Sequence, residues 1–269
     1  MRALSPLAEA HDTSRFGGKA SQLAAAMRAG LPVPTGIAVS WEGAERIAAG
    51  ARELLDVALA ALGDASFAVR SSAVDEDGAH ASFAGQHLTR LGVRGSDSLI
   101  DAVRAVWASG RSPGALAYRA RLGLRAPPRV AVVIQHMVHA DSAGVMFTRC
   151  PMSGDDVRVI EAAWGLGESV VSGAVDPDRY RVARGGAALS ITLGDKEIAI
   201  RANGEGEARE VPVDPHLRGR RCLGDAHLRA LDRLAASCEA HFSGPSPHDI
   251  EWAFTGDTVH LLQRRPATR

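Results

Sequence analysis

Five short segments of this sequence combine residues that could bind an anion or a metal ion, and the first lies near the amino terminus. Gly17 and Gly18 precede Lys19 at the expected start of a helix. Glycines at that place let the backbone approach an anion closely, while the helix N-terminus adds N–H groups and positive potential. The segment lacks the GxxxxGK[ST] spacing of a Walker A loop, so by itself it fits a flexible turn with a surface lysine better than a phosphate site.

The second segment is the strand-and-loop sequence FAVRSSAVDEDGAHASFAG, residues 67–85. We expect Arg70 at the end of the strand, where a buried guanidinium is costly unless it meets an anion. Its planar set of donors suits a phosphate, and Ser71 and Ser72 add hydroxyl groups beside it. The alternative is a structural arginine that pairs with one of the acids of the same loop.

The third segment, DIEWAFTGDTVHLLQRRP at residues 249–266, is typical of a hairpin with its turn near Gly256-Asp257. Such a turn brings Glu251 and Gln263 close to cross-strand register, with their side chains on one face. Carboxylate and amide oxygens suit Mg²⁺ when phosphate oxygens complete the coordination. Arg265 would lie at the same edge as an anion contact. The alternative is a solvated edge hairpin with alternating polar residues.

The last two segments could contact a nucleotide. The apolar run 132–138 carries Gln135 and His136, and its backbone groups could meet the edge of an adenine base. For the His136 imidazole itself, an ordinary core or surface position is the simpler interpretation. The glycine-rich segment 161–173 begins with Glu161, which could orient a ligand or face water.

Hydrophobic periodicity and turn residues predict the elements that must position these side chains. We expect helices over residues 18–29, 41–62, 96–109, 113–122 and 227–242. We expect strands over residues 36–40, 66–70, 86–93, 130–138, 142–148, 156–164, 179–182, 190–200, 248–254 and 258–263. Helices dominate the first half and antiparallel strands the second. This predicts an α+β fold with two lobes, 1–128 and 129–269, divided after two consecutive prolines.

Composition narrows the broad classes of function. Lysine plus arginine and aspartate plus glutamate are each 31, giving a formal net charge of +0, so no global attraction to nucleic acid or an anionic membrane is expected. The 3 cysteines form no CxxC pair, so neither a zinc site nor a disulfide framework is indicated. No segment reads as a secretion signal or a membrane span, so we expect a cytoplasmic location.

Five motifs follow one another along the chain: FGGKASQLAAAMRAGLPVPTGIAVS, FAVRSSAVDEDGAHASFAGQ, SAGVMFTRCP, VIEAAWGLGESVVSGAVDPDRY and DIEWAFTGDTVHLLQRRP. In this order they resemble the nucleotide-binding domain of the family of phosphoenolpyruvate synthase, pyruvate phosphate dikinase and rifampicin phosphotransferase. The resemblance covers nearly the whole chain. It implies a two-lobed ATP-grasp-like fold with the nucleotide in the cleft between the lobes.

The resemblance also implies roles for residues that match the family's motifs. Lys19 matches a phosphate-contacting lysine, and Arg70 matches the arginine that contacts the transferred phosphates. Glu251 and Gln263 match residues that help to hold Mg²⁺, and Arg265 matches the arginine that stabilises phosphoryl transfer. The hinge segment that meets adenine matches Gln135, His136, Met137 and Val138. The full set of expected ATP contacts is Lys19, Arg70, Ser71, Ser72, Gln135, His136, Met137, Val138, Glu161, Glu251, Gln263 and Arg265.

The resemblance implies that the chain cleaves ATP with Mg²⁺ and passes a phosphoryl group to a histidine on a separate domain or subunit. None of the 10 histidines lies in the GGxxSHxA-type motif of the family's phospho-accepting domain. A stand-alone small-molecule kinase, an ATP-grasp ligase, an excised domain of a longer enzyme and a non-catalytic nucleotide-binding module remain alternatives.

Two departures from the family's pattern stand out. The stretch between Ser40 and Ser66 is short for the family, so we expect a trimmed first lobe. Cys150 occupies a place in FTRCP where an acidic or small polar residue is more common in the family. The conformation of this turn is therefore not predicted from the resemblance.

Overall fold

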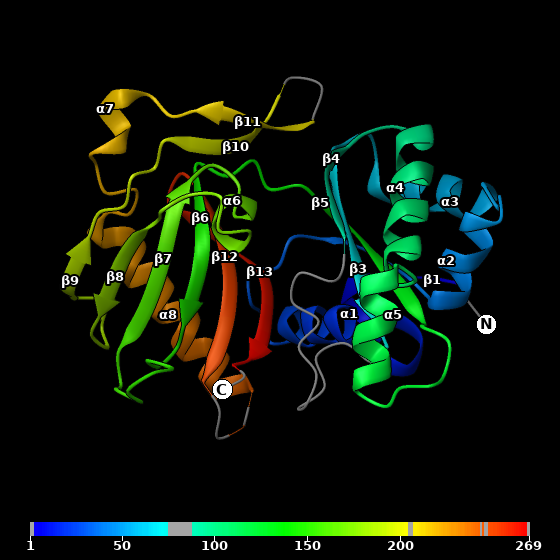
Figure 1. Cartoon of the computed structure of the whole chain (residues 1–269), viewed down its shortest axis with the longest axis horizontal. Helices are drawn as coiled ribbons and strands as arrows, with labels where there is room; N and C mark the ends of the chain where they lie inside the picture. The colour runs from blue at the N-terminus through cyan, green and yellow to red at the C-terminus, as the bar shows by residue number, and fades with distance from the viewer. Residues whose placement is uncertain (1–2, 75–87, 204–206, 243, 245–246, 268–269) are drawn as a thin grey trace. The chain divides into compact units, whose positions relative to one another are not determined.

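The computed structural model describes residues 3–74, 88–203, 207–242, 244 and 247–267, and the chain forms two compact units (Figure 1). The first unit comprises Met1–Arg28, Pro34–Met137 and Gly204–Glu207, and the second comprises Ala29–Val33, Val138–Asn203 and Ala208–Arg269. The expected division between residues 128 and 129 falls just before β5 (Val130–His136). The structure includes this strand in the sheet of the first unit.

A five-stranded sheet forms the centre of the first unit, in the order β1-β2-β5-β3-β4 with every neighbouring pair antiparallel. Besides β5, its strands are β1 (Leu4–Pro6), β2 (Gly36–Val39), β3 (Phe67–Ala73) and β4 (Thr89–Val93). The helices of this unit are η1 (Leu7–Glu9), α1 (Thr13–Arg28), α2 (Trp41–Ala48), α3 (Glu53–Leu62), α4 (Ser96–Ser109) and α5 (Pro113–Arg121).

The two faces of this sheet have different neighbours. Val69, Val132 and Ile134 belong to a buried apolar cluster with residues of α2, α3 and α4. Because side chains alternate along a strand, Arg70 and Ser72 point to the opposite face. Helix α1 lies on that opposite face, where it is hydrogen-bonded to Ser72. We call these the core face and the α1 face of the first sheet.

Two expectations about the first unit were wrong. The helix expected over 41–62 is two helices, because the chain turns at Gly50, whose φ of 114° lies outside the helical region and favours glycine. The strand expected to end at Arg70 continues to Ala73, paired with β5 along its whole length. Arg70 is therefore in the middle of a sheet strand rather than at its end.

A six-stranded antiparallel sheet forms the second unit, in the order β13-β12-β6-β7-β8-β9. Its strands are β6 (Ser142–Phe147), β7 (Arg158–Trp164), β8 (Asp178–Val182), β9 (Ala188–Thr192), β12 (His248–Thr255) and β13 (Thr258–Pro266). Strands β10 (Ile198–Ala202) and β11 (Ala208–Pro212) form a separate antiparallel pair. The helices are α6 (Glu168–Val171), α7 (Pro215–Arg218) and α8 (Asp225–His241).

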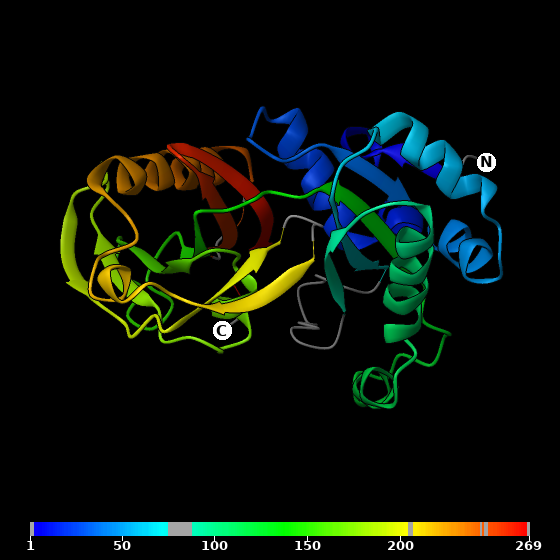
Figure 2. The ribbon, with the colours of Figure 1, turned by 90° about the horizontal axis from the view of Figure 1, so that it is seen from above.

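Helix α8 covers one face of the six-stranded sheet, and the β10–β11 pair lies on the other side (Figure 2). The expected apolar side of α8 is confirmed, since Leu228, Leu231, Leu234 and Ala235 are all buried. On the far side, Ile198 of β10 packs against a small cluster with Val145. We call this far side the Glu251 face, because Glu251 shares it with Val145 by direct register. None of the described helices is long and apolar enough to cross a membrane.

Candidate functional site

Helix α1 is kinked at the glycines that precede Lys19, and Ser72 of β3 stabilises the kink. Gly17 has φ 77° and ψ 174°, and a Cβ there would lie 2.0 Å from the Ser72 carbonyl oxygen. The Ser72 hydroxyl donates to the Phe16 carbonyl at 2.6 Å and accepts from the Ala20 amide at 2.9 Å. This hydroxyl therefore works as a cap for the second part of α1. Its single O–H is already used, so it has no further proton to donate to a phosphate.

Lys19 and Arg70 both belong to the α1 side of the first unit. Lys19 is 7% exposed and lies directly after the kink, and Arg70 is 9% exposed. Arg70 is paired in register with Val133 of β5 and Thr89 of β4, so the Thr89 side chain shares its face of the sheet. Two buried cations near one helix-and-strand junction are unusual, because lysine and arginine side chains are mostly exposed in folded proteins. The acids proposed as alternative partners of Arg70, residues 75–77, lie outside the described residues.

Ser71 and His136 point to the core face, away from the side of Arg70. Ser71 is in register with Val132, and its hydroxyl is buried without a hydrogen-bond partner among the described residues. The His136 ring lies 5.5 Å from the Phe67 ring, its Nδ1 is 2.9 Å from Thr35 Oγ1, and its Nε2 is 3.1 Å from the Leu62 carbonyl. These contacts fit the simpler interpretation of the imidazole as a structural group.

The boundary between the two units falls within the segment expected to meet adenine, between Met137 and Val138. Gln135 is 1% exposed and its Nε2 donates to the Pro34 carbonyl at 2.9 Å. The Met137 amide donates to the Ser66 carbonyl, and the Val138 carbonyl accepts from the Ala140 amide. The Met137 N–H is therefore already hydrogen-bonded within the protein. The contact of this segment with adenine stays a prediction.

In the second unit, the register expected for the last hairpin is confirmed. Glu251 of β12 faces Gln263 of β13, and the strands are joined by the two residues Gly256 and Asp257. A register shift follows directly, between Glu251 and Trp252. The hairpin thus places a carboxylate and an amide as a cross-strand pair on the Glu251 face, with Cβ atoms about 5 Å apart as expected for such pairs.

The Glu251 face also carries two pairs of oppositely charged side chains, Glu161 with Arg179 and Asp249 with Arg265. Glu161 of β7 pairs with Val145, which pairs in turn with Glu251, so Glu161 and Glu251 lie two strands apart, or about 10 Å. Glu161 accepts from Arg179 Nε at 3.3 Å. Two residues before Glu251 on the same strand, Asp249 Oδ2 accepts a hydrogen bond from Arg265 Nε at 2.9 Å and forms an ion pair with Nη2, also at 2.9 Å.

Glu251 and Gln263 fit a magnesium ion as a partial donor set. Both offer hard oxygen atoms on adjacent strands, and Mg²⁺ is commonly held by one or two protein oxygens with phosphates and water completing its octahedron. Among the described residues there is no group of three or more histidine, cysteine, aspartate or glutamate side chains that would form a metal cage.

Asp249 is the site residue that the sequence interpretation missed. Burial raises the pKa of its carboxyl, the Arg265 guanidinium opposes that rise, and the charge of Glu251 adds to it. The alternation of a strand puts residues 249 and 251 on one face, and that signal was available in the sequence. The partner across the strand could be assigned only once the register was known.

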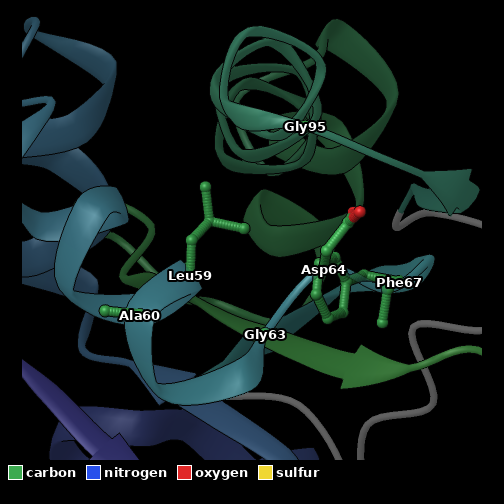
Figure 3. Close-up of a pocket in the computed structure, with 7 residues that line it drawn as sticks. Leu59, Ala60, Gly63, Asp64, Phe67 and Gly95 are labelled. Carbon is green, nitrogen blue, oxygen red and sulfur yellow. The ribbon is translucent and has the colours of Figure 1, made fainter.

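A surface cavity of about 340 Å³ lies elsewhere in the first unit, between the end of α3 and the start of α4 (Figure 3). None of the expected site residues lines it. Its walls are formed by Leu59, Ala60, Gly63, Asp64, Ala65, Phe67 and Gly95.

Comparison with known proteins shows which protein family the chain resembles. The chain matches the model of the family described as "Pyruvate phosphate dikinase, AMP/ATP-binding domain" over residues 44–269. Together with the mixed helices and sheets of the structure, this match confirms the expected α+β, ATP-grasp-like fold class. A solved structure of phosphoribosylglycinamide synthetase from Anaerococcus prevotii aligns with a TM-score of only 0.34 and 10% identity over 91% of this chain and 41% of that chain, and carries no conclusion.

Several curated relatives share substantial identity with the chain. A protein of Methanothermobacter thermautotrophicus named "Probable phosphoenolpyruvate synthase" is 44% identical over 208 residues, 76% of this chain and 30% of that protein. The rifampicin phosphotransferase of Streptomyces sviceus is 40% identical over 76% of this chain and 23% of its own length. The "Prodigiosin synthesizing transferase PigC" of Serratia marcescens is 35% identical over 94% of this chain and 32% of its own length. The chain thus spans about a third or less of each of these relatives.

Proposed function

The chain belongs to the family of pyruvate phosphate dikinase AMP/ATP-binding domains, and from that membership we propose that it binds ATP with Mg²⁺ and acts in ATP-dependent phosphoryl transfer. The observation that carries the proposal is the cross-strand pair of Glu251 and Gln263, with the Arg265 guanidinium next to it on the same face. Hard oxygen donors beside a guanidinium suit a complex of Mg²⁺ with a triphosphate.

Each unit contributes its own part to the proposed activity. In the first unit, Lys19 and Arg70 are the cations that we assign to the phosphates, and Gln135 and the backbone of residues 136–138 are assigned to the base. In the second unit, Glu251 and Gln263 would hold Mg²⁺, and Arg265 would contact the transferred phosphoryl group. When bound, the metal neutralises charge on the phosphate oxygens. The residues of the chain then orient the triphosphate and offset its remaining charge.

Four residues of the expected set of ATP contacts have other contacts or orientations within the protein. Ser72 supports the α1 kink with its hydroxyl, and Ser71 and His136 point to the core face. Glu161 is paired with Arg179 and supports the sheet beside Glu251. We therefore propose that direct contacts with the nucleotide come chiefly from Lys19, Arg70, Gln135, Glu251, Gln263 and Arg265.

We further propose that the phosphoryl group passes to a histidine on a separate domain or subunit. Relatives named phosphoenolpyruvate synthase and rifampicin phosphotransferase are three to four times longer than their matching part, which supports a role for further domains. Phosphorus NMR of the nucleotide products distinguishes the routes. AMP and phosphate would support the dikinase route, whereas ADP formed only with an added metabolite would support a direct small-molecule kinase.

Calorimetric titration of the chain with ATP tests the metal assignment. The double variant Glu251→Ala with Gln263→Ala should weaken MgATP binding by about tenfold or more, because the metal loses both protein oxygens. With EDTA present, the variant and the wild type should bind ATP equally. Glu197→Ala, which removes a glutamate of the same unit with a 63% exposed side chain, is the matched control and should bind like the wild type. Equal MgATP affinity in the double variant would refute the assignment.

A further inference from the structure

Asp249 and Arg265 form the best-defined ion pair on the Glu251 face. They are cross-strand partners: Nε of Arg265 donates to Oδ2 of Asp249 at 2.9 Å, and Nη2 lies in ion-pair contact with the same oxygen, also at 2.9 Å. The side chains are 14% exposed for Asp249 and 27% for Arg265. Contacts from two nitrogens to one carboxylate oxygen limit the rotation of the guanidinium more than a single contact would.

The Asp249 carboxylate lies in an electrostatically unfavourable position. Asp249 lies on the same strand face as Glu251, two residues away, so two carboxylates are held close together and one of them is largely buried. Replacing a buried ion pair with apolar residues is often neutral or stabilising, so stability alone is a weak reason to have it here. A guanidinium held in one orientation beside the proposed metal ligands is a stronger one.

The contacts with Asp249 also constrain the orientation of the rest of the guanidinium. Arginine carries five N–H groups in one plane, and the nitrogens Nε and Nη2 face Asp249. The edge of the guanidinium bonded to Asp249 is thereby fixed, and the orientation of the remaining N–H groups follows from it. A phosphate oxygen needs donors of this kind in a set position, because catalysis by charge neutralisation depends on preorganisation.

We propose that Asp249 is a positioning residue that orients Arg265 toward the triphosphate, an inference that rests on the function proposed above. Asp249 itself makes no contact with the nucleotide. It acts through Arg265, so its effect on the ligand disappears when the guanidinium is absent. This role differs from that of a charged group acting at a distance, because removal of a negative charge near a phosphate site would by itself favour ATP binding.

A double-mutant cycle on MgATP affinity, measured by calorimetry on the full chain, tests this role. Asp249→Asn should weaken MgATP binding about tenfold, within the range of coupling between contacting residues. In an Arg265→Ala background the same change should alter the affinity less than twofold. Asp249→Glu keeps the charge but shifts the carboxylate by one methylene, so it should also weaken binding. Tighter binding by Asp249→Asn, or an equal loss in both backgrounds, would overturn the proposal.

Three further measurements distinguish the positioning role of Asp249 from a general loss of an ion pair or of the folded state. Asp155→Asn breaks a carboxylate–arginine pair of the same 2.9 Å distance, to Arg181 of β8, and should leave MgATP affinity unchanged. Thermal unfolding without ligand shows whether each variant is folded. If Asp249→Asn fails to fold, the replacement cycle uses the single variants Asp249→Glu and Arg265→Lys and the double variant that combines them. If Arg265→Ala binds MgATP with wild-type affinity, the proposed site itself is contradicted. If Arg265→Ala loses MgATP affinity but the Asp249 variants do not, only the positioning role is contradicted.

Discussion

The three cysteines show how strongly local contacts decide the chemistry of a single residue. Hydrogen bonds from Ser153 and its neighbours, with a smaller contribution from Arg181, lower the pKa of the Cys150 thiol to about 7. Burial raises the pKa of Cys238 to about 12 and raises that of Cys222 further still. The turn that the sequence left open is closed by backbone hydrogen bonds between Cys150 and residues 154 and 155.

Cys150 should therefore be the first cysteine to react with iodoacetamide. At pH 7.5 a thiol with a pKa of about 7 is largely thiolate, which is the reactive form. All three thiols are buried, with Cys150 6% exposed, so alkylation of the native protein should be slow, but Cys150 should react faster than Cys222 or Cys238, as measured by mass spectrometry. Ser153→Ala should slow the reaction by removing the main hydrogen bond to the thiolate. Faster labelling of either other cysteine would contradict this.

At the scale of residues, local rules predicted only that Glu251 and Gln263 lie close to each other across the hairpin. The Gly256-Asp257 turn alone would pair Glu251 with Leu262, because Trp252 pairs with Leu261, and the register shift between Glu251 and Trp252 moves the pair to Gln263. The different orientations of Ser71 and Ser72 could not be predicted in the same way. Alternation says that they point to opposite faces, but only the tertiary structure shows that α1 packs on the face of Ser72.

At the scale of elements, the junction of α1 and β3 depends on the absence of a side chain at Gly17. A Cβ at this position would lie 2.0 Å from a backbone oxygen, and the positive φ of 77° adds strain for any other residue. Gly30 provides the contrast, because its φ is 72° but an added Cβ would meet nothing within 4 Å. The two glycines therefore separate the effect of a clash from the effect of backbone strain.

Gly17→Ala should lower the free energy of unfolding by about 2–4 kcal/mol, the sum of strain and a backbone displacement. Gly30→Ala should cost only about 1 kcal/mol, since strain alone applies there. Urea denaturation followed by circular dichroism measures both. Equal losses in the two variants would mean that the contact between Gly17 and Ser72 is not a stabilising feature of the α1 kink.

The errors in element prediction have a common physical origin. The alanine-rich stretch 41–62 has high helix propensity throughout, and Gly50 alone was too weak a signal to divide it. Strand β5 was read correctly as a strand, but its neighbours in the sheet are β2 and β3 from far earlier in the chain. Pairing over such a sequence distance is decided by tertiary packing, so the neighbours of β5 in the sheet could not be predicted from local patterns.

At the scale of the whole molecule, folding changes the proton affinity of two histidines in the second unit. Burial and the nearby Arg264 guanidinium lower the pKa of His248, with Glu239 and a backbone hydrogen bond opposing, and burial lowers the pKa of His260. His248 is 4% exposed, and its Nδ1 lies 3.4 Å from Arg264 Nη1. Both histidines are thus held in the neutral form, and the unfolded chain binds protons more readily at these two positions.

Stability should consequently fall as the pH is lowered below the ordinary histidine value of about 6.5. Above that pH both states are neutral at His248 and His260, and the full stability is present. Below it the unfolded state gains protons first, and the loss continues until the folded-state pKa is passed. Carboxylates with a lowered pKa, such as Glu239 beside Arg184 and Arg158, add a further loss at lower pH still.

Thermal unfolding at pH 7.5 and pH 5.5 measures this effect. In a chain of this size, each kcal/mol lost from the free energy of unfolding should lower Tm by about 2–4 °C. His248→Gln should reduce the fall in Tm between the two pH values, because glutamine does not titrate and removes the charge repulsion with Arg264. His11→Gln, which replaces an exposed histidine of the first unit, is the control and should leave the fall unchanged. An undiminished fall in His248→Gln would show that other groups dominate the acid sensitivity, and would contradict the assignment of this sensitivity to the buried His248–Arg264 contact.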